Sequence, residues 1–464
     1  MLAALLWLVT SPAQADSLKL VLNDPAGRPA PMDSCDVELC KSMVEIIDKA
    51  TTRIDYAFYG LRGQSAILDA LGRARARGVQ IRGVVDKDIH DENYYDDTDE
   101  LMALADPVVT DHKVDFATGR ARRDFRSSKF QCLRPTGFAG PLQCLAMDLG
   151  NGKCWVGAHV SREEIEYQGD IMHNKFVIVD ERWVWTGSTN ASDSGTGGYN
   201  ANLVTVIDSP TVAGWYTSEM EQMLQGKFHK TKTSQSPMRT RLSDDVHVQV
   251  LFSPQHKPIS KAVRPLIQSA RESIDIGVFF LTHKHLAQDL LTAHARGVKV
   301  RVIIDATAAK NGYTKHEVLR AAGIPVKIED WGGKMHAKSA VVDGEYVITG
   351  SMNWTSAGEN GNDENTVISI QVQATDDDDD DLTAAVSTSL KPEFGINPPL
   401  NVDVASTDNF QEDRISDSDV AATIPEEVDE SNISAAAVDD AEDIGIIDTT
   451  QDPIVSSQFD DEDV

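Results

Sequence analysis

Two segments of this chain repeat the same six residues at the same spacing, and this repetition constrains the fold more than any other feature. The pattern reads His-x-Lys-x4-Asp-x6-Gly-Ser-x-Asn, and it begins at His173 and again at His336. One such match arises by chance at roughly 10⁻⁸ per start position, given about one in twenty for each residue type. The chain therefore holds two copies of one structural unit, and the paired polar residues predict one shared site.

The duplication extends upstream of the motif. Residues 54–58 resemble residues 274–278, and residues 76–82 resemble residues 295–301. Each unit reads strand, helix, strand, helix, strand and then motif. The first helix of each unit has an apolar stripe that stops at a glycine, as expected at a helix C-terminus. The strands that follow are β-branched and too apolar for an exposed sheet. This alternation predicts an α/β fold with a mostly parallel sheet in each half.

The first residues predict export. Leu2–Val9 is an apolar run too short to span a bilayer, and Ala13-Gln14-Ala15 follows it with the small residues of a cleavage site. Residues 1–15 are therefore predicted to be a signal peptide, which implies a secreted or periplasmic location. No Lys or Arg precedes Lys19, and the alternative interpretation is a buried terminal strand.

The net charge of −30 over 464 residues is concentrated near the C-terminal end. From Asp376 to Val464 there are 27 Asp and Glu against two basic residues, so the rest of the chain carries only about −5. That body can approach a polyanion or an anionic membrane surface. The tail has few aromatic residues and no periodicity, and it is predicted to be disordered. A calcium site at the aspartate run 376–381 is the alternative, although the run lacks the glycine-turned spacing of a calcium loop.

These patterns divide the chain into a signal peptide (1–15), a first unit (16–230), a linker (231–245), a second unit (246–390) and an acidic tail (391–464). The first unit holds an insertion at about 110–168, because 66 positions separate Pro107 from His173 but only 11 separate Pro325 from His336. Seven basic residues and three phenylalanines lie in it between residues 112 and 134. The insertion is either a clamp for an anionic substrate or a solvated loop that never contacts the substrate.

The five cysteines show no C-x2-C zinc spacing. In an exported protein we expect Cys35 to pair with Cys40, and two of Cys132, Cys144 and Cys154 to pair with each other. The alternative is a set of reduced, buried thiols in a cytosolic enzyme.

The motif predicts a phosphate site. His and Lys two residues apart on a strand project from the same face, while Asn174 and Ala337 between them point into the packing. A tight turn at Asp343-Gly344 sends the chain back as a hairpin, which brings Gly-Ser-x-Asn beside His-x-Lys. Glycine permits close backbone approach, and Ser and Asn supply neutral hydrogen-bond donors.

Two such hairpins place two imidazoles, two ammonium groups and two amides around one point, a set that suits a tetrahedral anion. One neutral histidine can attack phosphorus while the other, protonated, donates to the leaving oxygen. Histidine holds both forms near neutral pH. No metal and no cofactor are expected. A metal site built from His173 and His336 is disfavoured, because two adjacent lysines would repel a cation.

The paired motif resembles that of the phospholipase D superfamily over residues 40–390, apart from the insertion. This resemblance implies two duplicated α/β lobes with mixed, mostly parallel sheets and an active site at their interface. It also implies a metal-independent phosphodiesterase that reacts in two steps through a covalent phosphohistidine. A monomer is sufficient for one site, because one chain carries both motifs.

The resemblance also implies residue roles. His173 becomes the nucleophile and His336 the general acid. Phosphate is bound by Lys175, Lys338, Asn190 and Asn353, with hydrogen bonds from Ser188 and Ser351. Asp180 and Asp343 belong to the same catalytic motif, and we expect them to brace the local fold rather than to contact the substrate.

Members of this superfamily often place an acid after the Gly-Ser segment to orient a catalytic histidine. Glu364, fourteen residues after Gly350, fits that position and is expected to hold His336, raising its basicity so that it starts the cycle as the acid. The gapless equivalent in the first copy is Ala201, beside Asn200 and Asn202. The remaining histidines that lack a partner across the copies are assigned no role: His90, His112, His229, His283 and His285.

The leading hypothesis is hydrolysis of phospholipid headgroup phosphodiesters, cardiolipin-like or phosphatidylcholine, with peripheral contact to a membrane surface. An endonuclease that cuts nucleic-acid phosphodiesters with the same site is the alternative, and the basic insertion would then guide the backbone. A lipid synthase is disfavoured because no membrane-spanning segment is found in the mature chain. An inactive polyanion-binding module is the remote alternative, since it would have no need of two complete His/Lys pairs.

Overall fold

The computed structural model describes residues 16–111 and 170–371, with short gaps at 24, 26–27, 88–91, 236–237, 244–245, 311–312 and 330. It also describes four short strands inside the insertion: β6 (Asp124–Arg126), β7 (Gln143–Leu145), β8 (Trp155–Gly157) and β9 (Glu164–Glu166). The predicted signal peptide, the side chains of the insertion with its three cysteines, and the acidic tail lie outside the described residues. Among the helices described, none has the length and apolar character needed to cross a bilayer.

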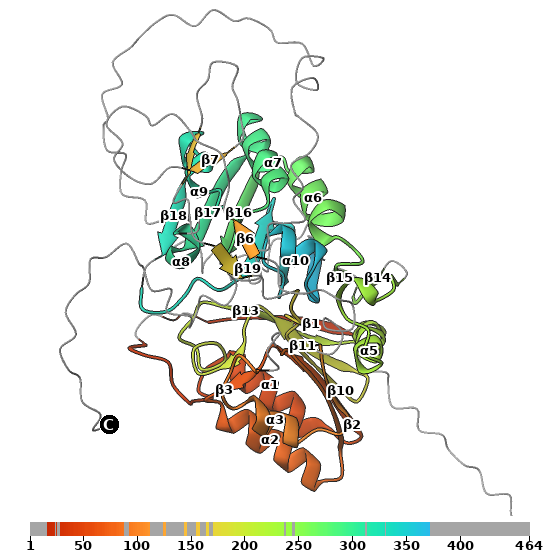
Figure 1. Cartoon of the computed structure of the whole chain (residues 1–464). Coiled ribbons are helices and arrows are strands. Elements are labelled where there is room, and N and C mark those ends of the chain that lie inside the picture. The colour runs from red at the N-terminus through yellow and green to blue at the C-terminus, as the bar shows by residue number, and fades with distance from the viewer. Residues whose placement is uncertain are drawn as a thin grey trace, which may run out of the picture.

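The first lobe is built on a seven-stranded sheet (Figure 1). In hydrogen-bonded order its strands are β1 (Ser17–Leu22), β13 (Leu203–Asp208), β11 (Trp183–Gly187), β10 (Phe176–Val179), β2 (Arg53–Phe58), β4 (Gln80–Val85) and β5 (Val108–Thr110). The same lobe also contains a small parallel pair of strands, β3 (Leu61–Arg62) and β12 (Ala191–Ser192). The helices of this lobe are α1 (Glu38–Lys49), α2 (Ser65–Ala76), α3 (Thr98–Ala103) and α5 (Pro210–Leu224).

The second lobe is built on an eight-stranded sheet. Its strands, in order, are β14 (Met238–Arg241), β15 (Val246–Ser253), β21 (Glu364–Gln371), β20 (Tyr346–Gly350), β19 (Lys338–Val342), β16 (Ser273–Val278), β17 (Lys299–Asp305) and β18 (Val326–Glu329). Its helices are η2 (Ile259–Val263), α6 (Arg264–Ser269), α7 (Lys284–Ala295), α8 (Ala306–Ala309), α9 (His316–Ala321) and α10 (Ser356–Asn360). The segment predicted as a linker thus contains β14, which pairs with β15.

The predicted α/β class, with two duplicated lobes and mixed sheets, is confirmed (Figure 1). Within the two large sheets, parallel pairing is confined to the strand–helix–strand parts, β2–β4–β5 and β16–β17–β18. The other neighbouring strands of these sheets pair antiparallel, so the sheets are mixed but not mostly parallel. The motif strands form antiparallel hairpins, β10–β11 and β19–β20, because turns of three residues, 180–182 and 343–345, are too short to join parallel strands. Glycines with positive φ stand past the ends of α2 and α7, as predicted: Gly78 (φ 86°) and Gly297 (φ 94°).

The same arginine–aspartate ion pair occurs at equivalent positions in the two lobes, as expected for duplicated units. In the first lobe the Arg82 guanidinium donates two hydrogen bonds of 2.6 Å to Asp55 on the neighbouring strand. In the second lobe Arg301 donates two hydrogen bonds of 2.6 Å to Asp275 in the same way. Both carboxylates are buried, and both pairs are bidentate, which is the strongest geometry available to an arginine and a carboxylate.

Apolar packing fixes the lobes against each other. One core cluster combines α1 and α2 with one face of the first sheet. Another combines α5 with strands of both sheets, and it includes Phe176 of the first lobe, Met220 of α5 and Val250 of the second lobe. Because one helix packs against both sheets, the interface between the lobes is part of the hydrophobic core, and groups placed there are held rigidly.

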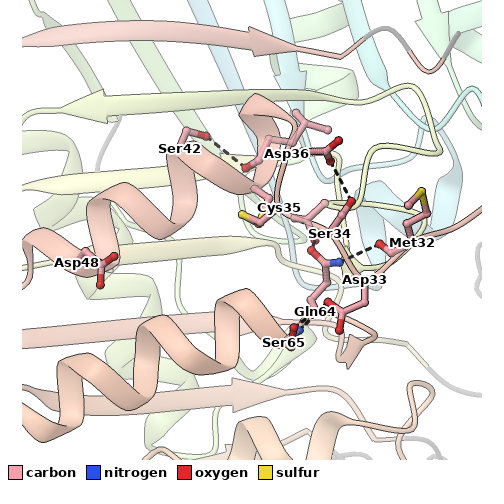
Figure 2. The surroundings of a disulfide bond; sticks show 12 residues. Met32, Asp33, Ser34, Cys35, Asp36, Ser42, Asp48, Gln64 and Ser65 are labelled. Atoms are coloured by element: carbon pink, nitrogen blue, oxygen red, sulfur yellow. Dashed lines mark hydrogen bonds between the residues drawn. A yellow bond between two sulfur atoms is a disulfide. The ribbon is translucent and has the colours of Figure 1, made fainter. Parts of the chain in front are cut away.

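The N-terminal segment is fastened by a disulfide. Cys35 and Cys40 are bonded, with their Cα atoms 5.1 Å apart, so this predicted pair is confirmed. Figure 2 shows how the same segment contacts the start of α2: Gln64 donates to the carbonyl oxygen of Met32, and Ser65 donates to the Asp33 carboxylate. The bond therefore secures a loop that also holds the beginning of a second helix.

Both motif aspartates brace hairpin turns, as predicted. Asp180, at φ 51°, accepts hydrogen bonds from the backbone N–H groups of Thr51, Thr52 and Arg53 and from both threonine hydroxyls. Asp343, at φ 55°, accepts from the backbone N–H groups of residues 271–273. Burial acts to raise the pKa of Asp180, but the hydrogen bonds from Thr52, Arg53 and Thr51 outweigh it and lower the pKa well below its ordinary value. Each aspartate ties its hairpin to the loop that precedes the neighbouring strand.

The Asp180→Ala variant should lose about 3 kcal/mol of unfolding free energy at neutral pH, because several charge-assisted hydrogen bonds disappear together. The folded-state pKa lies below the unfolded one, so this stabilisation is present above the ordinary carboxyl pKa and is lost as pH falls. Urea unfolding of both proteins at neutral and acid pH checks this, with the exposed neighbour Glu181→Ala as control. A difference between wild type and Asp180→Ala that persists unchanged at acid pH would contradict it.

Candidate active site

The two motifs meet where the lobes touch, and each is hydrogen-bonded to the opposite lobe. The backbone N–H of His173 donates to the carbonyl oxygen of Asp363 over 3.0 Å. The backbone N–H of His336 donates to the carbonyl oxygen of Ala201 over 3.0 Å. Single parallel bridges, Met172 with Asp363 and Ala201 with Met335, accompany these contacts. The segment that enters each motif strand is thus paired with the loop that follows the Gly-Ser segment of the other copy.

The carboxylate of Glu364 holds His173. The Nδ1 atom of His173 lies 2.8 Å from Oε1 and 2.9 Å from Oε2 of Glu364, and Ser351 donates its hydroxyl to Oε2 over 2.6 Å. The expectation that Glu364 holds His336 was wrong. The backbone pairing across the lobe interface explains the difference. It turns Glu364, the first residue of β21, toward the histidine of the first lobe and not toward the one in its own lobe.

His336 is held by an amide. Its Nδ1 atom lies 3.1 Å from Oδ1 of Asn202, which also accepts the hydroxyl of Ser188 over 2.7 Å. Asn202 is therefore the structural counterpart of Glu364, and the gapless choice of Ala201 was one residue short. The backbone shows why: Ser188 N–H donates to the carbonyl of Leu203, and Ser351 N–H donates to the carbonyl of Asn365, so the first loop contains one extra residue.

The two serines thus act on the partners of the histidines. Each donates its hydroxyl to the side chain that holds a ring, Ser188 to Asn202 and Ser351 to Glu364. The hydrogen bonds that these serines make in the structure reach the histidine partners, and their predicted hydrogen bonds to phosphate stay a prediction. Sequence reasoning had named Asn202 only as a neighbour, and its position after the first Gly-Ser segment was the signal that could have found it.

The motif lysines lie in matching surroundings. Lys175 donates to the carbonyl oxygen of His173 over 2.9 Å, and Lys338 donates to that of His336 over 2.7 Å. Both side chains are almost fully buried. Aromatic rings stand beside each pair: Tyr59 packs edge-on against His173, with centroids 5.7 Å apart. In the second lobe Phe279 lies 5.1 Å from His336 by the same measure and 5.1 Å from the Lys338 ammonium.

The electrostatics around the two histidines favour neutral rings. Burial lowers the pKa of His173 well below its usual range, and the charges of Lys175, Lys338 and His336 lower it further. Burial also lowers the pKa of His336, with Lys338, Lys175 and Lys334 acting in the same direction. Each of the two lysines lowers the pKa of both histidines, so the four groups lie close enough to interact electrostatically. An anion bound among them would offset the lysine charges and raise both histidine pKa values.

The motif asparagines differ from each other. Asn190 donates to the hydroxyl of Tyr95 over 3.0 Å, whereas both polar atoms of the buried Asn353 have no hydrogen-bond partner among the described residues. A buried amide without partners is rare in folded proteins, so both atoms are available to hydrogen-bond a bound group. Within the same part of the chain, no group of three His, Cys, Asp or Glu side chains is arranged to hold a metal ion.

Comparison with known families and proteins agrees with this architecture. A family model described as "Cardiolipin synthase, PLD-like domain" matches residues 43–224 and 263–382. The chain belongs to this family and therefore to the phospholipase D superfamily.

Individual relatives match a shorter part. A mitochondrial cardiolipin hydrolase of Xenopus tropicalis is 41% identical over 103 residues, 22% of this chain and 49% of that protein. The human mitochondrial cardiolipin hydrolase is 37% identical over 110 residues, 24% of this chain and 43% of its own length. A phospholipase D of Rickettsia conorii is 36% identical over 109 residues, 24% of this chain and 54% of that protein. The chain spans about half the length of the curated relatives it matches.

Two solved structures are also similar. The phospholipase D family member Nuc from Salmonella typhimurium is 26% identical, with a TM-score of 0.27, and covers 32% of this chain and 91% of its own. The phosphatidylserine synthase of Haemophilus influenzae is 12% identical, with a TM-score of 0.48, and covers 76% of this chain and 83% of its own.

Proposed function

We propose that the chain is a phosphodiester hydrolase of the phospholipase D type, which acts in two steps through a phosphohistidine and requires no metal. The observation that carries the proposal is the meeting of two buried His/Lys pairs at the lobe interface, each ring held through Nδ1 by a side chain of the other lobe. Holding Nδ1 fixes each ring so that Nε2 is left to react.

In the first step, Nε2 of neutral His173 attacks phosphorus. The new P–N bond forms as the P–O bond to the leaving alcohol breaks, and His336 in its protonated form gives its Nε2 proton to that oxygen. The bound phosphodiester anion supports protonation of His336, because it offsets the lysine charges that otherwise lower the pKa of this ring.

In the second step, water attacks the phosphohistidine. Neutral His336 removes a proton from the water, the P–N bond breaks, and the phosphate monoester leaves as His173 returns to its starting form. Both steps place negative charge on the nonbridging oxygens, which we assign to Lys175, Lys338, Asn190 and Asn353. The unpartnered amide of Asn353 supports this assignment.

The different partners of the two rings support His173 as nucleophile. Bond formation to phosphorus puts positive charge on the attacking imidazole, and the Glu364 carboxylate stabilises that charge. The neutral amide of Asn202 gives His336 no such stabilisation, so the protonated ring is the better proton donor. This assignment of roles is the one made from the sequence, although it now rests on a carboxylate beside the nucleophile.

For substrate, we favour phospholipid headgroup phosphodiesters at a membrane surface, since the curated relatives named above are two cardiolipin hydrolases and a phospholipase D. Nucleic acid is the second candidate, and the run of seven basic residues between 112 and 134 is what favours it. We also propose export to an oxidising compartment, secreted or periplasmic, which the Cys35–Cys40 disulfide supports.

A substrate panel tests the function. The purified full chain is incubated with mixed vesicles of phosphatidylcholine and cardiolipin, and separately with single- and double-stranded DNA, with and without a chelator. We expect headgroup release from lipid that the chelator does not change, and none with His173→Ala. Cleavage of DNA alone would reassign the substrate to nucleic acid. Loss of activity on chelation would contradict the metal-independent mechanism, and no activity on any substrate would favour a binding module.

A further inference from the structure

A cluster of buried charged groups lies beside the active site, and the proposed mechanism uses none of them. At its centre is His229, the first residue of the short helix η1 (His229–Thr231) that connects α5 to β14. Its ring is fully buried, with Nδ1 3.0 Å from Oδ2 of Asp363 and Nε2 3.4 Å from Oδ2 of Asp111. Its backbone N–H donates to Oδ1 of Asp363 over 2.8 Å.

A buried lysine completes the cluster. The ammonium of Lys232 lies 2.7 Å from Oδ1 of Asp363, contacts the carboxylate of Glu219 on α5, and donates to the carbonyl of Ser253 over 3.1 Å. Burial acts to raise the pKa of Asp363, but the charges of Lys232 and His229 outweigh it and keep the pKa below its usual value. Asp363 is therefore an ionised group that both cations contact.

His229 joins a carboxylate of each lobe. Asp111 follows β5 in the first lobe, and Asp363 precedes β21 in the second. Each ring nitrogen of His229 lies within ion-pair distance of a carboxylate oxygen, and two carboxylates beside one buried ring favour its protonated form. The residue also adopts φ 49°, a left-handed conformation that non-glycine residues keep only where their surroundings impose it.

The same two carboxylate residues hold the backbone that carries His173. The carbonyl oxygen of Asp363 accepts the N–H of His173 over 3.0 Å, and Oδ2 of Asp111 accepts the N–H of Met172 over 3.0 Å. Asp363 is also the residue before Glu364, whose carboxylate holds the ring of His173. Asp363 is therefore adjacent to Glu364 and hydrogen-bonded to His173, and Asp111 is hydrogen-bonded to the residue before His173.

Among the residues that the structure describes, the other half of the site has no such cluster. The position that corresponds to Asp363 is Ala201, whose carbonyl accepts the N–H of His336. Asp305 accepts the N–H of Met335 over 2.9 Å, as Asp86 does for Met172 over 2.8 Å, so this part of the arrangement is shared. Around Ala201 and Met335, however, the packing is apolar. In the described part of the chain, the carboxylates that contact the imidazole and lysine of the connection between the lobes therefore belong to residues that hydrogen-bond the backbone of residues 172 and 173, and not that of His336.

We propose that His229 is a positioning residue for the nucleophile. As a buried cation it ties Asp111 of the first lobe to Asp363 of the second, and so fixes the backbone of Met172 and His173 against Asp363 and Glu364. The inference rests on the proposed function for its kinetic consequence. Its structural content, that His229 maintains the hydrogen bond between His173 and Glu364, can be measured independently of any activity.

The test compares His229→Gln and His229→Asn with wild type on bis(4-nitrophenyl) phosphate. We expect kcat to fall about tenfold in His229→Gln, because a small displacement of the nucleophile costs rate, while KM changes less than about twofold. Asn tolerates the left-handed backbone and keeps a donor near Nδ1, so His229→Asn should recover part of kcat. The control is His316→Gln, which removes another buried histidine paired with a carboxylate, Glu317 on the same helix.

Two results would overturn the inference. One is a kcat in His229→Gln equal to that of wild type. The other is an equal fall in kcat in His229→Gln and His316→Gln, with the fall in each variant explained by its loss of thermal stability. If the wild-type protein hydrolyses no phosphodiester, the proposed function fails instead. The inference is then decided by proton NMR of the His173 Nδ1–H, whose hydrogen-bonded resonance should be lost or should exchange faster in His229→Gln and would be unchanged if the inference is wrong.

Discussion

Replacing His173 by alanine should abolish turnover and covalent labelling together. Without the ring there is no nucleophile for phosphorus, and the remaining lysines and amides only bind the phosphate. Loss of a nucleophile from a comparable covalent mechanism costs several orders of magnitude, so we expect kcat to fall about 10⁴-fold or more. Initial rates on bis(4-nitrophenyl) phosphate and labelling with a ³²P-phosphodiester, quenched in alkali because phosphohistidine is acid-labile, measure both effects.

A folding defect must be separated from the chemical one. His316→Ala is a matched control, because His316 and His173 are equally buried, each 2% exposed, but only His173 lies at the interface of the motifs. The control should retain most of its turnover, and both variants should keep a cooperative thermal transition. Labelled protein recovered from His173→Ala would show that the nucleophile is a different residue.

Replacing His336 by alanine should give a different result, in which the covalent intermediate accumulates. The 4-nitrophenolate group leaves without a proton donor, so His173 can still be phosphorylated. Hydrolysis of the intermediate then lacks its base and should slow by about 10³-fold. We expect a rapid release of nitrophenolate close to the amount of enzyme, followed by a very slow steady rate, and a label that peptide mapping places on His173.

The leaving group provides the internal control for this variant. With an alkyl phosphodiester, whose alcohol needs protonation to leave, His336→Ala should form the intermediate slowly and show no burst. If the burst is absent with both substrates, or if His173→Ala and His336→Ala are labelled to the same extent, the assignment of nucleophile and acid is wrong.

Much of the fold could be predicted because the signals are local or repeated. The doubled motif indicated the duplication, and the dipeptide Asp343-Gly344 indicated the hairpin, whose turn has positive φ at both residues. The bracing by Asp180 and Asp343 could also be predicted. It depends on a short side chain at a turn, which binds backbone N–H groups of a nearby loop wherever the hairpin is placed.

The partners of the histidines could not be assigned correctly from the sequence. Glu364 was found by its spacing, but its target depends on how the lobes dock, and docking turned it toward His173. Asn202 was missed by one residue, because an alignment without gaps cannot represent the extra residue in the first loop. Sequence spacing therefore predicted which residues belong to the site, while their pairing required the tertiary structure.

His229 was missed for a different reason. Histidines without a counterpart in the other copy were assigned no role, and this criterion selects only what the two copies share. A chain that uses one ring as nucleophile and the other as acid must also contain features that the copies do not share. The charged cluster around Asp363, which has Ala201 as its counterpart, is such a feature, and its residues come from the connection between the copies as well as from the copies themselves.

The exchange of ring partners between the lobes explains how two copies of one unit give their histidines unequal surroundings. The carboxylate that holds one imidazole and the amide that holds the other each lie in the opposite half of the chain, so neither half alone determines the surroundings of its own histidine. Because the partner is a carboxylate in one case and an amide in the other, the two rings have a charged and a neutral partner respectively, although they come from copies of the same unit.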